Sequence, residues 1–82
     1  MARGWDWEIV GYIDHEGVRH KGGPEPAVEP AGIQAVIVRA WDPRDEDDYQ
    51  TMLVPALAYF NSWYEILSAI GHALAQYGIE MA

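Results

Sequence analysis

Apolar and polar side chains alternate over residues 5–13, WDWEIVGYI. A period of two is typical of a β-strand that buries one face. The following residues, Asp14 to Gly17, predict a turn, because aspartate and glycine are favoured at its first and last positions. Pairing Ile13 with Val18 would complete a hairpin and place Val18 on the buried face. We expect that face to carry Trp5, Trp7, Ile9 and Ile13.

Residues 33–41 are rich in β-branched side chains and are apolar at every position from 35 to 38. An apolar run without alternation predicts a central strand that is covered on both faces. A second apolar stretch follows at residues 49–54, and joining the two as a hairpin places residues 42–48 at its tip. Pro55 has no backbone donor, so the second strand should end or bulge there.

The spacing of apolar residues becomes helical after residue 61. Ser62 and Glu65 match the capping box, in which the serine hydroxyl and the glutamate carboxylate bind free backbone amides at a helix start. We predict a helix over residues 63–77, with Gly78 as its left-handed C-terminal cap. The stripe that should pack on the sheet consists of Trp63, Ile66, Leu67, Ile70, Leu74 and Tyr77.

An alternative start of this helix lies at Pro55, because Leu57 and Phe60 would extend the same stripe.

Residues 22–32 are rich in proline and glycine and predict an extended internal loop. Together these elements predict a single domain over residues 1–82, of the α+β class. Its three- or four-stranded antiparallel sheet should carry one C-terminal helix on one face, in the order ββββα.

The outer side of the predicted helix carries little charge. Glu65 is its only formally charged residue, and a helix exposed to water normally carries more. One explanation is a second packing surface, such as a homodimer contact through the outer face, where Gly71 and the alanines allow close approach. The alternative is an exposed helix with few charges. The outer positions are Ser68, Ala69, His72, Ala73 and Gln76.

The chain is strongly acidic: thirteen Asp and Glu against five Lys and Arg give it a formal net charge of -8. This charge repels phosphate backbones and anionic membrane surfaces and favours basic partners, so we expect neither direct nucleic-acid binding nor membrane binding. Half of the residues are hydrophobic, which predicts a packed core. There is no cysteine, no signal-peptide pattern and no apolar run of the roughly 20 residues that span a membrane, so we expect a cytoplasmic protein.

Residues that could serve catalysis do not fall in a recognised catalytic spacing. Because Ser62 is explained as a helix cap and no glycine-rich phosphate loop opens a helix, we expect no enzyme and no cofactor. An EF-hand loop starting at Asp45 would need glycine where Gln50 stands, so we expect no dedicated metal site. The candidate catalytic residues are His15 with Glu16, His20, His72, Ser62 and Ser68.

The most acidic stretch, residues 41–49, reads WDPRDEDDY. We hypothesise that it docks on a basic groove, where carboxylates form charge-assisted hydrogen bonds with arginine and lysine and aromatic rings supply apolar contacts. Glu25 and Glu29 would add to this surface. The alternative is a solvated hairpin tip whose charges keep the sheet edge from pairing with another chain. The expected contact residues are Trp41, Asp42, Asp45, Glu46, Asp47, Asp48 and Tyr49.

A small, cysteine-free, acidic α+β chain with the cluster Asp45–Glu46–Asp47–Asp48 resembles the phage-encoded inhibitors of bacterial defence systems, anti-CRISPR proteins among them. The resemblance rests on size, charge and this one cluster. It implies that the protein blocks nucleic-acid entry or target pairing in its partner. Together with the acidic surface, this predicts a non-enzymatic protein-binding module, a stoichiometric inhibitor that mimics nucleic acid and binds a basic nucleic-acid-binding protein.

Two alternatives come from other functional classes. One is a self-associating structural or accessory module, which would use the helix and an exposed strand edge. The other is a small-molecule module, with nucleotides as its example ligands, that uses Trp5, Trp7 and Trp41 as stacking surfaces. Only five cationic residues are available to hold phosphates in that second case.

Overall fold

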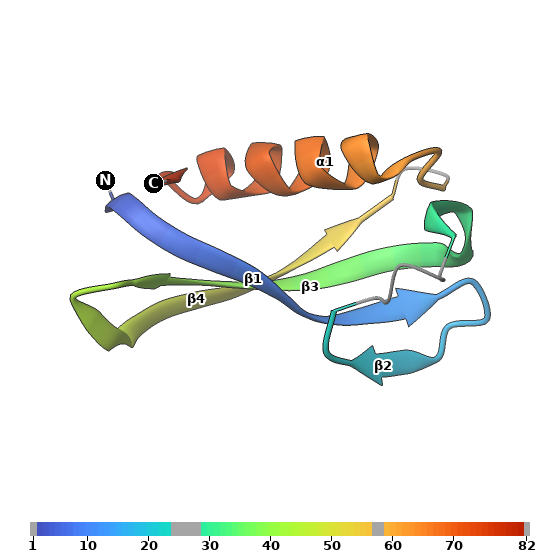
Figure 1. Cartoon of the computed structure of the whole chain (residues 1–82), viewed down its shortest axis with the longest axis horizontal. Helices are drawn as coiled ribbons and strands as arrows, with labels where there is room; N and C mark the ends of the chain where they lie inside the picture. Colours follow the sequence, from blue (N-terminus) through green and yellow to red (C-terminus); the bar gives the residue numbers. More distant parts are fainter. Residues whose placement is uncertain (1, 24–28, 57–58, 82) are drawn as a thin grey trace.

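The chain forms a twisted antiparallel sheet with one helix across one face, and its order confirms the α+β prediction (Figure 1). The structure is a computed structural model, and it describes residues 2–23, 29–56 and 59–81. No helix among these residues is long and apolar enough to cross a membrane. The elements are β1 (Ala2–Asp14), β2 (Arg19–Lys21), a 3₁₀ turn η1 (Pro30–Gly32), β3 (Ile33–Asp42), β4 (Asp45–Pro55), α1 (Trp63–Gln76) and β5 (Ile79–Met81).

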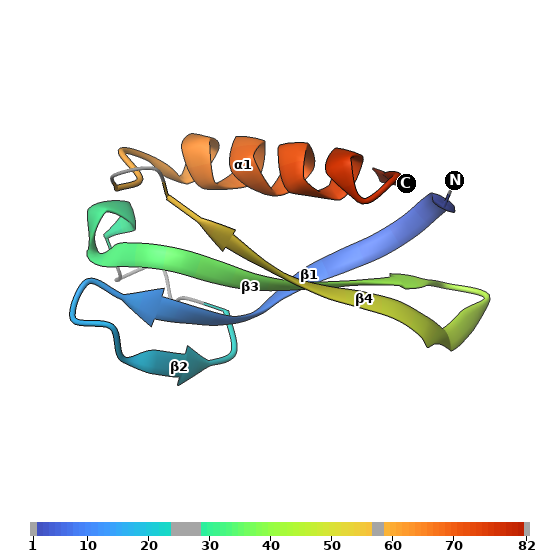
Figure 2. The same cartoon turned by 180° about the vertical axis from the view of Figure 1, so that it is seen from behind.

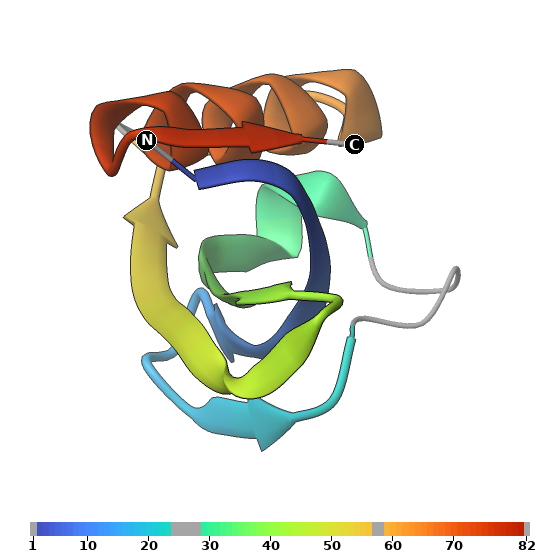
Figure 3. The same cartoon turned by 90° about the vertical axis from the view of Figure 1, so that its left-hand side faces the viewer.

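The strands lie in the order β2-β1-β3-β4, so β3 is central, as expected. The end-on view shows how far the sheet curves beneath α1 (Figure 3). One strand was not predicted: after Gly78, at φ 74°, the chain forms β5, which runs parallel to the first residues of β1. A three-residue strand carries too short a pattern to be distinguished from a loop. The predicted role of Gly78 as a left-handed helix cap is confirmed.

A β-bulge in β1 corrects the predicted buried face of this strand. Ile9 and Gly11 pair with consecutive residues of β3, so Val10 has no partner there. One extra residue moves every later side chain to the opposite face. Tyr12 therefore packs against the core, whereas Ile13, which we expected on the core face, lies on the other side of the sheet.

The register of the β1–β2 hairpin also differs from the prediction by one residue. Ile13 pairs with Arg19 rather than with Val18, which is 49% exposed. Gly17 explains the difference: its φ is 83°, and its amide donates to the carbonyl oxygen of Asp14 at 3.0 Å. A glycine in the left-handed region adds one residue to the turn and shifts the pairing beyond it.

Helix α1 begins at Trp63 as predicted, and the alternative start at Pro55 is wrong because β4 extends to that residue. The Ser62 hydroxyl oxygen accepts from the backbone amide of Glu65 at 3.3 Å. The reciprocal half of the capping box is displaced by one residue, since the Glu65 carboxylate accepts from the backbone amide of Asn61 at 2.8 Å. This bond holds the pKa of Glu65 below its ordinary value.

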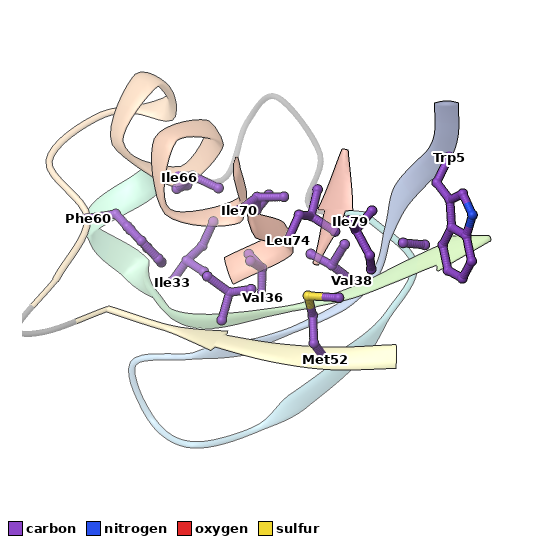
Figure 4. Close-up of a cluster of buried hydrophobic side chains, with 12 residues drawn as sticks. Trp5, Ile33, Val36, Val38, Met52, Phe60, Ile66, Ile70, Leu74 and Ile79 are labelled. Atoms are coloured by element: carbon purple, nitrogen blue, oxygen red, sulfur yellow. The ribbon is translucent and has the colours of Figure 1, made fainter. Parts of the chain in front are cut away.

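The hydrophobic core lies between α1 and the inner face of the sheet (Figure 4). Two residues of the predicted helical stripe, Leu67 and Tyr77, are 51% and 56% exposed and do not belong to this core. The helix turns by roughly 100° per residue, so one narrow seam meets the sheet while its flanks face outward. The core consists of Trp5, Ile33, Val36, Val38, Ala40, Met52, Val54, Phe60, Ile66, Ile70, Leu74 and Ile79.

The prediction that β3 is covered on both faces holds only in part, because on the face opposite α1 Ala35 is 4% exposed but Ile37 is less buried. Val36 and Val38 are fully buried beneath α1, but Ile37, on the opposite face, is only half-buried. Leu53 of β4 pairs with Ile37 and is 55% exposed. Helix α1 packs on the opposite face of β3, over Val36 and Val38.

The predicted loop at residues 22–32 is only partly within the described residues, because 24–28 lie outside them. Glu29 has the extended conformation expected before a proline, with φ -71° and ψ 139°. The 3₁₀ turn η1 that follows was not predicted. It brings the carbonyl oxygen of Gly32 to 3.0 Å from the amide nitrogen of His15, which ties the loop to the β1–β2 turn.

Candidate functional site

The β3–β4 hairpin projects past the end of α1 and carries the acidic stretch at one end of the molecule (Figures 1 and 2). Its turn is shorter than predicted, because only Pro43 and Arg44 lie between the two strands. Trp41 and Tyr49 face each other as a cross-strand pair. The structure thus brings both predicted aromatic residues together at the base of the hairpin end.

Asp42 closes this turn rather than facing outward. Its Oδ1 accepts from the backbone amide of Arg44 at 2.9 Å and from Arg44 Nε at 3.1 Å. The side chain of Asp42 is 16% exposed, whereas that of Arg44 is 81% exposed. The hydrogen bonds from the Arg44 backbone and guanidinium hold the pKa of Asp42 below its ordinary value. Asp42 is therefore less available to a partner than the sequence suggested.

The other four carboxylates of the stretch are all exposed on β4. Trp41 pairs with Tyr49 but Asp42 pairs with Asp45, so the three residues between Asp45 and Tyr49 have no partner in β3. Among the described residues, none of these four carboxylates forms an ion pair. We call them the acidic edge: Asp45, Glu46, Asp47 and Asp48.

A cation lies beside the acidic edge on the outer face of the sheet. The Arg39 guanidinium carbon is 4.6 Å from the centre of the Tyr49 ring and 5.9 Å from that of Trp41, which is cation–π range. Arg39, Trp41, Glu8 and Glu46 line a small hollow of 190 Å³. Tyr49 is nevertheless 53% exposed, so much of its side chain can meet another molecule.

Sequence reasoning missed Arg39 and Glu8 as members of this site. Arg39 stands two residues before Trp41, so the period of two in a strand could have placed the two on one face. Glu8 comes from β1 and reaches the site only through its pairing with Arg39. Glu29 lies beside η1 at the start of β3, away from the hairpin end, and Glu25 is outside the described residues.

A second polar cluster lies at the β1–β2 hairpin. His20 Nε2 is 2.8 Å from Asp14 Oδ2, and the imidazole stacks on the Tyr12 ring with 4.6 Å between centroids. Asp14 Oδ1 accepts from the backbone amides of Glu16 and Val18, both at 2.9 Å. The hydrogen bond from His20, followed by that from Val18, lowers the pKa of Asp14. These contacts give the cluster a structural role in the turn.

The remaining catalytic candidates are dispersed. His15 Nε2 is 3.8 Å from Glu16 Oε1 on an exposed turn, and Ser62 caps α1. His72 and Ser68 are exposed on the helix. Within the described part of the chain, no group of three or more histidine or carboxylate side chains converges to hold a metal ion.

The tryptophans differ in their access to solvent. Trp5 is 8% exposed and belongs to the core, and Trp7 packs against it. Trp41 is half-buried beside Arg39. Trp5 and Trp7, two of the three rings predicted as stacking surfaces, therefore contribute to the packing of the core.

A groove of 620 Å³ separates α1 from the C-terminal part of β4. The outer helix residues expected from the sequence line it, although Ala69 and Ala73 also pack against the core. Leu53 and Pro55 form its β4 side. The groove lies on a different part of the molecule from the acidic edge.

No protein-family model, no curated protein and no solved structure matches this chain. Function is therefore inferred from its own residues.

Proposed function

We propose that this protein is a non-enzymatic binding module that presents the acidic edge to a basic nucleic-acid-binding protein and blocks it stoichiometrically. A phage-encoded inhibitor of the anti-CRISPR type, acting in the cytoplasm, is the concrete form of this proposal. The observation that carries it is the exposure of all four acidic-edge carboxylates on a hairpin end that projects from the core.

The electrostatic support comes from carboxylates that have not been neutralised. Arg44, the nearest cation in sequence, is paired with Asp42, and Arg39 is directed at the rings of Trp41 and Tyr49. Free carboxylates can accept charge-assisted hydrogen bonds from arginine and lysine, and their field raises the rate of encounter with a basic surface. Groups that bind phosphates in the partner can bind these carboxylates instead.

The apolar support comes from the aromatic pair beneath the acidic edge. Tyr49 is half-exposed, while the cation–π contact with Arg39 restricts its ring before binding. An ordered tyrosine contributes contact area with little further loss of side-chain entropy. Asp45 is ordered in a similar way, since its Oδ1 accepts from the amide of Asp47 at 3.2 Å.

The test compares two variants that remove the same charge from different places. Glu46→Gln/Asp48→Asn changes the acidic edge, and Glu16→Gln/Glu29→Gln changes exposed carboxylates elsewhere. Each removes two negative charges from the net -8 of the chain. Immobilised wild type is used to capture partners from cell lysate. The captured protein is then purified and its binding to labelled nucleic acid is titrated with each variant by fluorescence polarisation.

We expect wild type and the Glu16/Glu29 variant to displace nucleic acid at a one-to-one ratio. The Glu46/Asp48 variant should bind the partner roughly two- to thirtyfold more weakly, because it loses two exposed ion pairs that contribute about 0.2–1 kcal/mol each. Added salt should weaken the wild-type complex. Equal weakening by both variants, or a captured partner that still binds its nucleic acid, would contradict the proposal.

A further inference from the structure

We propose that the groove between α1 and β4 binds a second copy of this chain, so that the protein forms a two-fold symmetric dimer. This proposal does not depend on the acidic edge, which lies elsewhere on the molecule. It rests on three features: the low charge of the groove, the open edge of β4, and the positions of one carboxylate and one imidazole on α1.

The groove is nearly uncharged although the protein is strongly acidic. Of the eleven residues that line it, only Glu65 carries a formal charge at neutral pH, whereas the whole chain has thirteen carboxylates. Two copies with a net charge of -8 each repel one another at most orientations. Contact through this face brings one carboxylate of the groove lining, Glu65, from each copy and covers apolar area on Leu53 and Tyr64, which are 55% and 79% exposed.

The open edge of β4 borders this groove. In the described sheet β4 is the last strand, and its outer edge pairs with no other described strand. The C-terminal part of β4 rises along one flank toward α1 in the end-on view (Figure 3). An unpaired edge can add a strand from another chain. A two-fold axis through the groove would bring the two β4 strands together in antiparallel orientation, with each acidic edge directed away from the axis.

The polar side chains on α1 are self-complementary about that axis, because the Glu65 carboxylate can accept a hydrogen bond from an imidazole. Glu65 and His72 are seven residues apart, which is two turns of helix, so they lie on one face about 10 Å apart along its axis. Their midpoint falls between Ser68 and Ala69. In an antiparallel pair of helices that cross at this midpoint, Glu65 faces the partner's His72, and symmetry repeats the contact.

Side chains at the crossing point are small enough for close contact. Ser68, Ala69 and Ala73 line the groove, and neighbouring helices with small residues can approach at the short end of the usual range of about 8–10 Å. The hollow continues into a second one of 330 Å³ that shares Pro55, Glu65 and Ala69. The apolar surface therefore extends beyond the crossing point toward the start of α1.

The test uses Ser68→Glu and a matched control, Ala75→Glu. Both positions are exposed on α1 and both substitutions add one carboxylate, but only Ser68 lines the groove. Sedimentation equilibrium at rising concentration should show wild type and Ala75→Glu approaching twice the chain mass of 9.2 kDa. Ser68→Glu should weaken dimerisation at least about tenfold, because it places two carboxylates beside the axis.

A second pair of variants tests the contact between Glu65 and His72. His72→Glu should weaken the dimer, since Glu65 would then face a carboxylate, and His72→Lys should retain or strengthen it. Circular dichroism of each variant verifies that α1 is still formed. A wild type that stays at 9.2 kDa at every concentration would overturn the proposal and leave the groove to a different partner. Equal effects of Ser68→Glu and Ala75→Glu would overturn it as well.

Discussion

Asp14 shows how one side chain can fix a turn. Its carboxylate accepts hydrogen bonds from two backbone amides within the turn, and His20, on the returning strand, lies within hydrogen-bonding distance. The stacked ring of Tyr12 holds the imidazole in place. The geometry favours the charged form of Asp14, because an ionised carboxylate is the better acceptor.

Replacing His20 should raise the pKa of Asp14. Hydrogen bonding from His20 is the largest cause that lowers this pKa below 3.8, so His20→Ala should move it back toward that value. The carboxyl carbon shift of Asp14, followed by NMR during an acid titration, measures the change. Asp42 is the internal control, because Arg44 rather than His20 lowers its pKa. Unchanged titration of Asp14 in the variant would contradict the assignment.

The same shift makes the hairpin sensitive to acid. Because the pKa of Asp14 is lower in the folded state, its contribution to stability is complete above pH 3.8 and is lost as the pH falls through the folded pKa. In Asp14→Asn that contribution is absent at every pH. On acidification, the free energy of unfolding measured with urea should therefore fall less in the variant than in wild type. Equal decreases would exclude this role for Asp14.

In helix α1, neighbouring positions of the apolar stripe differ sharply in burial. Ile70 is fully buried against the sheet, whereas Leu67 is 51% exposed, although both belong to the same apolar stripe in sequence. We expect Ile70→Ala to lower the free energy of unfolding by about 2–5 kcal/mol, because it leaves a cavity in the core. Leu67→Ala, the matched control, should cost less than about 1 kcal/mol. Urea denaturation compares the two, and similar losses would mean that the packing face is misplaced.

How far the sequence predicts these elements depends on what defines each one. The helix was predictable because Ser62, Gly78 and the apolar spacing all indicate the same boundaries. The strand registers were not predictable, because Val10 and Gly17 are each an extra residue whose effect on the pairing appears only when the partner strand is known. A bulge adds no distinctive residue type at Val10, so the alternation in β1 looked continuous.

The candidate site was predictable only as a linear segment. The sequence located the acidic edge and the aromatic pair, but it could not show that Asp42 is used within the turn. Arg39 and Glu8 join the site through the pairing of β1 with β3. Contacts between strands distant in sequence depend on register, which is the least predictable property of this fold.

For the whole molecule, the net charge of -8 acts on folding as well as on binding. Compact packing brings like charges closer, so we expect self-repulsion to destabilise the folded state. Raising the salt from 20 to about 500 mM should increase the free energy of unfolding, because the screening length falls to a few ångströms. Urea unfolding at both salt concentrations measures this increase.

A variant with four fewer carboxylates serves as the control for the salt effect. Combining Glu16→Gln, Glu29→Gln, Glu46→Gln and Asp48→Asn should raise stability at low salt and reduce the gain from added salt. A decrease in wild-type stability with salt would instead mean that the attractive pairs, such as Asp42 with Arg44, outweigh the repulsion.

The parallel pairing of β1 with β5 joins residues from the two ends of the described chain, Ala2 with Ile79 and Trp5 with Met81. Closing so long a loop costs more entropy than forming either hairpin, so we expect this contact to form late in folding. Ile79 and Trp5, which take part in this pairing, are 6% and 8% exposed. This end of the core is therefore where the folded protein should open first, exposing the indole of Trp5 while β3 and β4 remain paired.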